Sequence, residues 1–372
     1  MTNKHLITLT PVGNYFFGSE GGFGDKNTED AKADKDQLIN YLVSGNNFPQ
    51  QTTLLGMLRF ELLRKKGLLA PKHNSKEAIT LVGSSGFNGS ETEFGIIRKL
   101  SPVFIKKAGN PLLPSRTLVQ SENKEKNRQL NFTKSGVKNG NGSLLNNYDA
   151  KNHIDYEFAN QSATVLHQLN GIFSYPSQIG IKKNYKGQTD DDAFFKQTFR
   201  RLKKGFAFAF YAEFVENAKL EFEKGIIAIG GDQSLFKFEF SEPLANTLFD
   251  IIDIENNDII SKATENETFE ILLLNDCMVS NKIFDDPDLQ FSVNDIQDFR
   301  YIKTNSATVH FSNLDIRGGL IKSIKAEMIA RSAVLFVKGK KALNRITAYL
   351  ENEENPAFKN IGYNYFKIKK IT

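Results

Sequence analysis

The clearest pattern in the chain is an alternation of large apolar residues with small or polar ones that starts at Phe206. Phe208, Phe210, Ala212 and Phe214 follow at every second position, so they lie on one face of a predicted strand. This stretch partly resembles an RNA-stacking strand of RRM domains, but a continuous row of phenylalanines is typical of a core face. We therefore predict that these rings are buried.

Two segments show helical spacing instead. In the first, Thr52 and Thr53 stand where an N-cap is expected, and Gly67 follows as a stop signal. In the second, the carboxylates of Asp190 to Asp192 follow Thr189 and precede a stripe of apolar residues, and Gly205 ends the pattern. The apolar positions of the two predicted helices are Leu54, Leu55, Leu58 and Leu62, then Phe195, Phe199 and Leu202.

Strands are predicted at His5 to Thr10, at 78–82 and at 96–105, where Pro102 interrupts the last one. The second and third of these strands are expected to pair. With the two helices and the strand from Phe206, the order becomes β-α-β-β-α-β, which is that of a ferredoxin-like sheet covered by two helices.

After residue 222 a second group of elements begins, and its order is not resolved by the pattern. Gly230 and Gly231 form a turn between two short strands. The expected elements are strands at 225–229 and 235–240, a helix at 244–252, and strands at 269–274, 308–311, 333–337 and 363–368.

The predicted fold class is therefore α+β, with two ferredoxin-like (RRM-like) domains and long loop insertions. The first domain spans 1–222, with an insertion at about 108–150 that is rich in Asn, Lys, Gly and Ser. The second domain spans 223–372. A chain of 372 residues is long enough for two domains of ordinary size.

Composition adds limits on partners and location. Lys and Arg total 48 against 43 Asp and Glu, so the net charge of +5 is small and any polyanion must be bound by a local patch. Cys277 is the single cysteine, which excludes a disulfide framework within the chain and favours a reducing, cytoplasmic location. No apolar run approaches the roughly 18 residues of a membrane span, so no membrane partner is expected.

The segment from Phe48 to Arg59 joins a polar loop to the start of the first helix. Free backbone N–H groups and the positive end of the helix dipole favour phosphate at such a position. Gln50, Gln51, Thr52 and Thr53 lie at this start and are candidate RNA contacts. An ordinary capped helix without a ligand explains the same pattern.

The same segment resembles the P-x-x-T-x-x-G-x-x-R element of the RAMP superfamily, specifically of the guide-capping subunit of type III-B (Cmr) CRISPR effector complexes. Gly18 and Asn364 depart from the family pattern, which often has an arginine and a glycine there. Further similar segments occur in the family order at Thr10–Phe17, Ser101–Ile105, Pro111–Pro114, Gly180–Lys183, Gly230–Asp232 and Ile361–Tyr363.

The resemblance implies a subunit without catalytic residues, metal or cofactor. It implies that the chain binds the repeat-derived 5′ handle of a guide RNA, and that it lies beside the large polymerase-like subunit and the filament backbone subunit.

Other candidate RNA contacts are cations and aromatic residues near predicted turns. Cations and an aromatic ring close together can meet phosphates and an unstacked base, although a lysine-rich loop is often only a solvated surface. These candidates are Lys182, Lys183, Tyr185 and Lys186 in one loop, Arg200 and Lys204 at the second helix, and Gly230 and Gly231 at the later turn.

Two alternatives remain open. The five histidines show no metal-ligand spacing, and the turn at Asp232 lacks the paired carboxylates of two-metal chemistry. His167 or His310 could still act in a metal-independent endoribonuclease that cuts precursor guide RNA. The chain could also be a general single-strand binder without preference for a handle.

Overall fold

The computed structural model has a mixed α and β architecture built mainly on antiparallel sheets, which confirms the predicted α+β class. It describes residues 3–18, 42–69, 75–83, 87–90, 93–123, 126–130, 153–183, 186–187, 189–218, 220, 222, 224–230, 233–299, 302–304, 320–323, 326–351 and 354–371.

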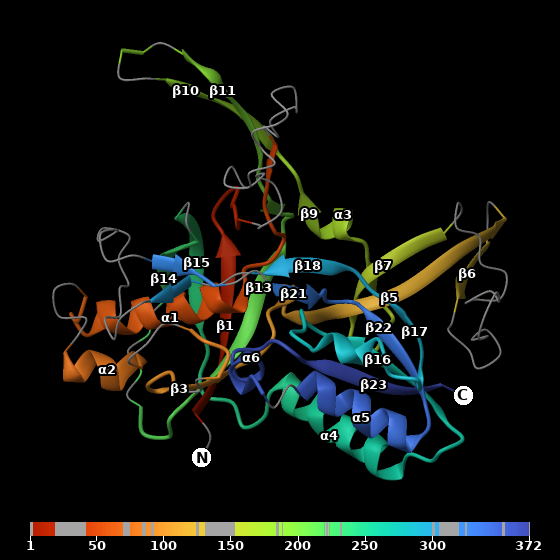
Figure 1. Ribbon diagram of the computed structural model, residues 1–372. Coiled ribbons are helices and arrows are strands. Elements are labelled where there is room, and N and C mark those ends of the chain that lie inside the picture. The colour runs from red at the N-terminus through yellow and green to blue at the C-terminus, as the bar shows by residue number, and fades with distance from the viewer. Residues whose placement is uncertain are drawn as a thin grey trace, which may run out of the picture.

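A ten-stranded sheet forms the larger part of the molecule (Figure 1). Its main path runs β14-β15-β1-β13-β4-β5-β7-β8, with β3 paired to β13 and β6 paired to β5. The strands are β1 Asn3–Pro11, β3 Ile97–Leu100, β4 Phe104–Lys107, β5 Asn110–Asn123, β6 Lys126–Leu130, β7 His153–Asn160, β8 Leu166–His167, β13 Phe206–Phe214, β14 Gly225–Ile229 and β15 Ser234–Phe240.

Helices α1 (Gln51–Lys65) and α2 (Lys76–Val82) lie against one face of this sheet, below β14 and β15 in Figure 1. The predicted apolar face of β13 is buried there, with Phe208 and Phe210 in one core cluster with Leu54 and Leu58 of α1. The interpretation of these rings as core rather than as a base-stacking surface is therefore confirmed.

A second sheet has the order β17-β22-β16-β23 and packs against two helices (Figure 1). Leu343 and Ile346, on a helix that the sequence patterns did not predict, are fully buried against it. The elements are β16 Thr268–Leu273, β17 Leu289–Val293, β22 Val334–Lys338, β23 Phe366–Ile371, α4 Leu248–Lys262 and α5 Lys340–Glu351.

Smaller elements connect and extend these two bodies. Strands β10 and β11 form a hairpin that projects far from the rest of the molecule (Figure 1). The elements are β2 Leu42–Ser44, β9 Phe173–Ser174, β10 Ser177–Lys183, β11 Thr189–Thr198, β12 Arg201–Leu202, β18 Ile296–Phe299, β19 Ile302–Thr304, β20 Leu320–Lys322, β21 Ala326–Ile329, α3 Leu169–Ile172, α6 Pro356–Asn360 and the 3-10 turn Asn281–Ile283.

Two predicted elements have the wrong type. Residues 78–82 belong to helix α2, because the Ser75 hydroxyl accepts a hydrogen bond from the backbone of Ala78 and caps a helix start. The predicted helix at 189–204 is instead β11 and β12, and β11 pairs with β10 through backbone hydrogen bonds. The predicted β-α-β-β-α-β order of the first half is therefore wrong.

Two further expectations need correction. The predicted strand pair between 78–82 and 96–105 does not form, and both β3 and β4 pair with β13 instead. The proposed insertion at 108–150 contains β5 and β6, and β5 pairs with β7 over much of its length. The rest of that insertion and the predicted strand at 308–311 lie outside the described residues.

Most of the other predicted elements are confirmed near their expected bounds: β1, α1, β3 with β4, β13, β14 with β15, β16, β22 and β23. The helix predicted at 244–252 forms, but it begins at Leu248 and extends to Lys262. Strands β14 and β15, which the sequence assigns to the second half, belong to the first sheet, where β15 pairs with β1 and β14 pairs with β15. The division into two domains at 222 and 223 stays a prediction, as does their ferredoxin-like character.

Candidate nucleic-acid interface

A cavity of about 370 Å³ opens at the amino-terminal end of α1. Segments from distant parts of the chain surround it, including the loop before α1, strands β5 and β7, and turns of the carboxy-terminal half. Residues that line it include Phe48, Pro49, Gln50, Arg116, Glu157, Arg200, Asp276, Asp295, Asp298, Arg331 and Tyr363.

The start of α1 differs from the sequence prediction. Gln50, not Thr52 or Thr53, is the N-cap residue, and its backbone carbonyl accepts from the amides of Thr53 at 3.0 Å and Leu54 at 3.2 Å. No side chain caps this helix. The cap role predicted for Thr52 and Thr53 is therefore wrong, and Gln50 lines the cavity.

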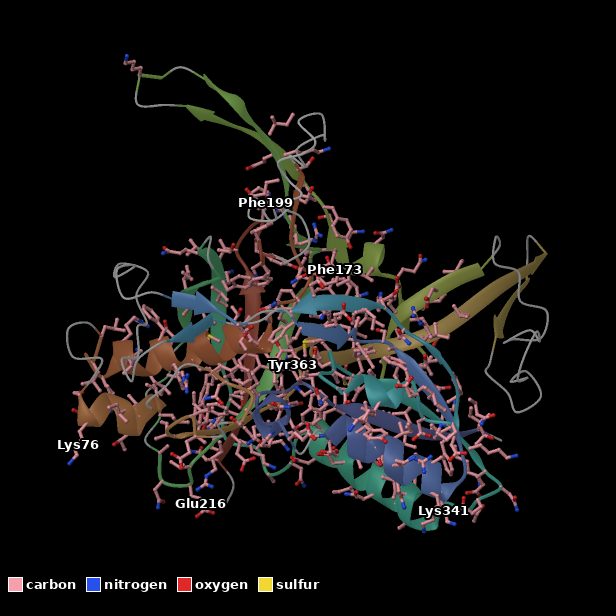
Figure 2. The ribbon with its side chains drawn as sticks, in the orientation of Figure 1. Lys76, Phe173, Phe199, Glu216, Lys341 and Tyr363 are labelled. Carbon is pink, nitrogen blue, oxygen red and sulfur yellow. The ribbon has the colours of Figure 1, made fainter. Side chains whose placement is uncertain are left out.

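Gln51 is buried and connects α1 to two other segments. Its side-chain amide donates to the carbonyls of Ser101 and Ile361, both at 2.8 Å. Its backbone amide donates to the hydroxyl of Tyr363 at 3.2 Å, and burial raises the pKa of that phenol, so the hydroxyl stays neutral. Gln51 thus orients the helix start, and Tyr363 lies near the middle of the molecule (Figure 2).

Phe48 and Arg331 form a stacked pair in the wall of the cavity. The guanidinium carbon of Arg331 lies 3.9 Å from the ring centroid of Phe48. The same guanidinium donates to the Asn275 side-chain oxygen at 2.8 Å and lies 3.4 Å from the Asp276 carboxylate. Its Nη1 atom is buried without a hydrogen-bond partner among the described residues.

Two more arginines line the same cavity. Arg200 donates to the side-chain oxygen of Asn47 at 2.8 Å and lies 4.8 Å from the ring centroid of Tyr175. Arg116 pairs with Asp155 at 3.0 Å, and its Nε atom is buried with no partner in the described part of the chain. Three guanidinium groups therefore converge on one hollow at a helix amino terminus.

Carboxylates interrupt this positive charge. Glu157 accepts a hydrogen bond from the backbone of Leu169 at 3.0 Å, and desolvation by burial raises the pKa of Glu157. Asp295 and Asp298 also line the cavity. The cavity therefore offers both hydrogen-bond donors and acceptors, unlike a purely basic anion site.

The projecting hairpin carries the second group of predicted contacts. Lys182 and Lys183 end β10, and Lys186 is exposed in the connection to β11. Nothing is described of the side chains of Lys182 and Lys183, and Tyr185 lies outside the described residues. At the base of the hairpin, the rings of Phe16 and Phe199 lie 6.1 Å apart, and Figure 2 labels Phe199 there.

The other predicted contacts lie elsewhere. Arg59 is only 3% exposed, and its guanidinium lies 5.4 Å from the ring centroid of Phe94 in the core. Lys204 is exposed in the turn before β13 and is not among the cavity-lining residues. Gly230 adopts a positive φ of 81° in the turn between β14 and β15, and Gly231 lies outside the described residues.

Sequence patterns missed Arg116 and Arg331. Arg116 falls in a stretch that composition assigned to an insertion, and Arg331 stands in a turn without any motif. No sequence signal that we recognise would have selected either residue, because only the fold brings them to Phe48.

Asn364, one of the departures from the family pattern, takes the role that a glycine commonly fills. It adopts a positive φ of 61°, which asparagine tolerates better than most residues. Its side-chain amide accepts from the Met278 backbone N–H and donates to the Met278 and Leu350 carbonyls, each at 2.8 Å. This replacement keeps the turn closed.

Groups relevant to the enzymatic alternative are sparse in the described part of the chain. Among those residues no group of three or more His, Cys, Asp and Glu side chains could hold a metal ion. His167 lies on β8, where burial lowers its pKa, and His310 lies outside the described residues. Within the same described residues, no helix has the length and apolar character needed to cross a membrane.

A protein-family model described as "CRISPR-associated protein (Cas_Cmr3)" matches residues 7–369. The chain belongs to the Cas_Cmr3 family. The predicted resemblance to RAMP-type subunits of type III-B (Cmr) CRISPR complexes is thereby confirmed. No curated protein matches the chain.

Solved structures agree with this assignment at the level of the fold. One is a chain of a cryo-EM structure described as "the Type III-B Cmr-beta bound to cognate target RNA and AMPPnP, state 1", with a TM-score of 0.51 and 14% identity. The match covers 98% of this chain and 95% of the other. A second, described as "the Type III-B Cmr-beta bound to cognate target RNA", has a TM-score of 0.50, 14% identity, and covers 98% and 96% of the two chains.

Proposed function

We propose that this Cas_Cmr3 family member is a non-catalytic, RNA-binding subunit of a type III-B effector complex that holds the 5′ handle of the guide RNA. The single observation that supports this most directly is the convergence of Arg116, Arg200 and Arg331 on a cavity at the amino terminus of α1. Guanidinium groups and helix amino termini are both common phosphate ligands.

The Phe48 and Arg331 pair supports a nucleotide rather than a simple anion. Single-stranded RNA is commonly recognised by stacking of bases on aromatic rings and guanidinium planes. Arg116 and Arg331 each have a buried nitrogen without a hydrogen-bond partner among the described residues. Such groups cost free energy, and acceptors on a nucleotide would satisfy them.

The carboxylates of the cavity support recognition of base edges. Glu157, Asp295 and Asp298 would repel a bare polyphosphate, but they can accept hydrogen bonds from the exocyclic amines of bases. This mixture of charges favours a handle-specific site over the general single-strand binder, whose contacts would be purely electrostatic.

The hairpin of β10 and β11 supplies a second contact. It projects from the body (Figure 1). Lys182 and Lys183 end β10, and Lys186 follows in the connection to β11. Cations there would bind the RNA backbone beyond the cavity. Lys204, Gly230 and Gly231 remain candidate contacts, whereas the burial of Gln51 and Arg59 favours a structural role for both.

We also propose that both halves of the chain derive from a ferredoxin-like plan. In the first sheet β1 lies between β13 and β15, and in the second sheet β16 lies between β22 and β23. In the second sheet the first strand in chain order therefore lies between the third and the fourth, and in the first sheet β1 likewise lies between two later strands. A helix follows β1 in one sheet and β22 in the other. The pairing of β15 with β1 favours placing β14 and β15 in the first domain.

The same proposal includes protein neighbours, namely the large polymerase-like subunit and the filament backbone subunit. Membership of the Cas_Cmr3 family supports them, together with the likeness to chains of Cmr-beta structures.

Purified chain and fluorescently labelled handle RNA test the RNA-binding proposal. We expect Arg331→Ala to weaken binding by about tenfold or more, because it removes both a stacking surface and a charge. Arg64→Ala is the matched control, since Arg64 lies at the other end of α1 and is 47% exposed. Equal affinity of the wild-type chain for handle and scrambled RNA would overturn handle recognition.

A cleavage assay separates the proposal from the enzymatic alternative. Labelled repeat RNA should remain intact after prolonged incubation with the chain in the presence of a metal chelator. Site-specific cleavage that disappears in His167→Ala or His310→Ala would establish a metal-independent endoribonuclease instead.

A further inference from the structure

The outer edges of the two sheets differ in how well they are protected. An edge strand presents unpaired N–H and C=O groups that attract other strands, and proteins usually shield such edges with charges, bulges or short strands. At one end of the ten-stranded sheet, β8 has only two residues. In the second sheet, β17 has an irregular register between Leu289 and Phe291.

The other edge of the second sheet, β23, is shielded in two ways. The Asn256 side chain accepts a hydrogen bond from the backbone of Ile368 and donates to the carbonyl of Phe366, both at 2.8 Å, so it takes the place of a neighbouring strand. In addition, Lys367, Lys369 and Lys370 place charges along this strand.

In the described part of the chain, strand β14 carries neither a charge nor a bulge. Its sequence, Gly225 to Ile229, contains no charged residue, and among the described residues it pairs only with β15. A short, uncharged strand rich in isoleucine is the kind of segment that aggregates when its edge stays open.

The face of β14 and β15 that points away from α1 carries several exposed apolar residues beside the charged Lys237 and Glu239 of β15. Ile226 is 62% exposed, Leu235 is 52% exposed and Val12, whose amide donates to the Leu235 carbonyl at 2.9 Å, is 50% exposed. Ala228, which lies opposite Leu235 in the register, is exposed as well. We call these four residues the β14 patch.

We propose that an extended strand of a neighbouring protein subunit adds to the edge of β14 and covers the β14 patch. The row of backbone donors and acceptors on β14 selects an extended polypeptide over a helix. Since Lys224 and Lys237 are exposed beside the patch, we expect apolar side chains in the added strand with a carboxylate near them. The β14 patch is aliphatic and contains no aromatic ring on which a base could stack, so it suits a polypeptide better than RNA.

This inference rests on the proposed role of the chain as a subunit of a larger assembly. Five residues of strand span only about 17 Å, so the added strand belongs to a larger interface. The β14 patch therefore identifies one part of the surface through which the chain joins its complex.

Co-expression of the tagged chain with the other subunits of its Cmr complex tests the inference. We compare Ile226→Lys and Leu235→Lys with Ile254→Lys, an isoleucine on α4 that is 66% exposed and lies outside the patch. We expect the first two variants to recover at least about tenfold less of one protein subunit, while Ile254→Lys recovers normal amounts. All variants should keep wild-type melting temperatures and wild-type binding of handle RNA.

Amide hydrogen exchange gives an independent measurement on the unmodified chain. The edge amides of β14 should exchange quickly in the isolated chain and slowly in the assembled complex. Unchanged exchange on assembly, or normal subunit recovery in both lysine variants, would overturn the inference.

If the isolated chain forms a dimer that Ile226→Lys dissociates, a second copy occupies the edge and the inference is also wrong. A wild-type chain that recovers no subunit would instead contradict the proposed function.

Discussion

The hydroxyl of Tyr363 accepts a hydrogen bond from the backbone amide of Gln51, although 312 residues separate them in the chain. This contact joins the start of α1 to the turn before β23, and both segments border the cavity. The candidate RNA site is therefore assembled from the two ends of the protein, so its geometry depends on correct packing of both halves.

We expect Tyr363→Phe to lower the free energy of unfolding by about 1–2 kcal/mol, because a buried N–H of Gln51 loses its acceptor. Urea denaturation followed by circular dichroism measures this change. Tyr349→Phe, on the partly exposed side of α5, is the control and should change stability by less than about 0.5 kcal/mol. Equal stability of the two variants would mean that the hydrogen bond contributes little.

Gly362 makes room for the Gln51 side chain. It adopts a positive φ of 99°, and an added Cβ would lie 1.8 Å from the amide nitrogen of Gln51. We expect Gly362→Ala to destabilise the protein by about 3 kcal/mol or more and to weaken handle binding. Gly56→Ala, in the interior of α1 with nothing within 4 Å of the added Cβ, should instead stabilise it by about 0.5–1 kcal/mol. Thermal melts of the two variants should shift in opposite directions.

The sequence predicts Arg59 as an RNA contact, whereas the structure places its side chain in the core. If Arg59 served only to contact RNA, its replacement by alanine would leave the stability of the fold unchanged. Because it is 3% exposed and packs over Phe94, we expect Arg59→Ala to lower stability by about 2–3 kcal/mol. Any loss of RNA binding should then track the unfolded fraction. A stable variant that still loses RNA affinity would restore Arg59 as a contact.

The raised pKa of Glu157 predicts a pH dependence. Burial favours the protonated form of this carboxyl in the folded chain, so its contribution to stability is present below the ordinary pKa of glutamate and is lost as pH rises through the raised folded pKa. Glu157→Gln keeps an oxygen that can accept from Leu169 but cannot ionise. We expect it to be more stable than wild type at neutral pH, with the difference shrinking towards pH 4 in urea titrations. A constant difference across this range would mean that Glu157 ionises normally.

The lysines of the hairpin should contribute mainly non-specific charge. We expect the combined replacements Lys182→Ala, Lys183→Ala and Lys186→Ala to weaken the binding of handle RNA and of scrambled RNA to a similar extent. The slope of log affinity against log salt should fall by about 0.7 for each phosphate that the variant no longer neutralises. Binding isotherms at several salt concentrations measure it, with Lys262→Ala on α4, 75% exposed, as the control. An unchanged slope would mean that the hairpin lysines do not contact the RNA.

Sequence patterns were sufficient to predict an element wherever one of its faces is buried and its apolar residues recur at a clear period. The phenylalanines of β13 and the leucines of α1 show this, because the spacing of apolar residues follows directly from strand and helix geometry. The family assignment came from the same source, since short segments in the order typical of the family can be read directly from the linear sequence.

Local sequence signals gave the wrong element type where a helix and a strand are both compatible with the same residues. Residues 78–82 are too short for periodicity to separate strand from helix, and the carboxylates at 190–192 suit a helix start although β11 pairs with β10 instead. Backbone pairing between distant segments decides such cases, and no local pattern reports it.

The amino-acid order was thus enough to predict an α+β protein, its family and a candidate RNA contact in the segment from Phe48 to Gln50. The folded chain alone revealed the meeting of Arg116, Arg200 and Arg331 around that segment and the burial of Gln51 and Arg59. It also revealed that β14 ends the sheet in the described part of the chain. The physical reason is that a site depends on side chains brought together by long-range packing, whereas sequence periodicity reflects only neighbours along one element.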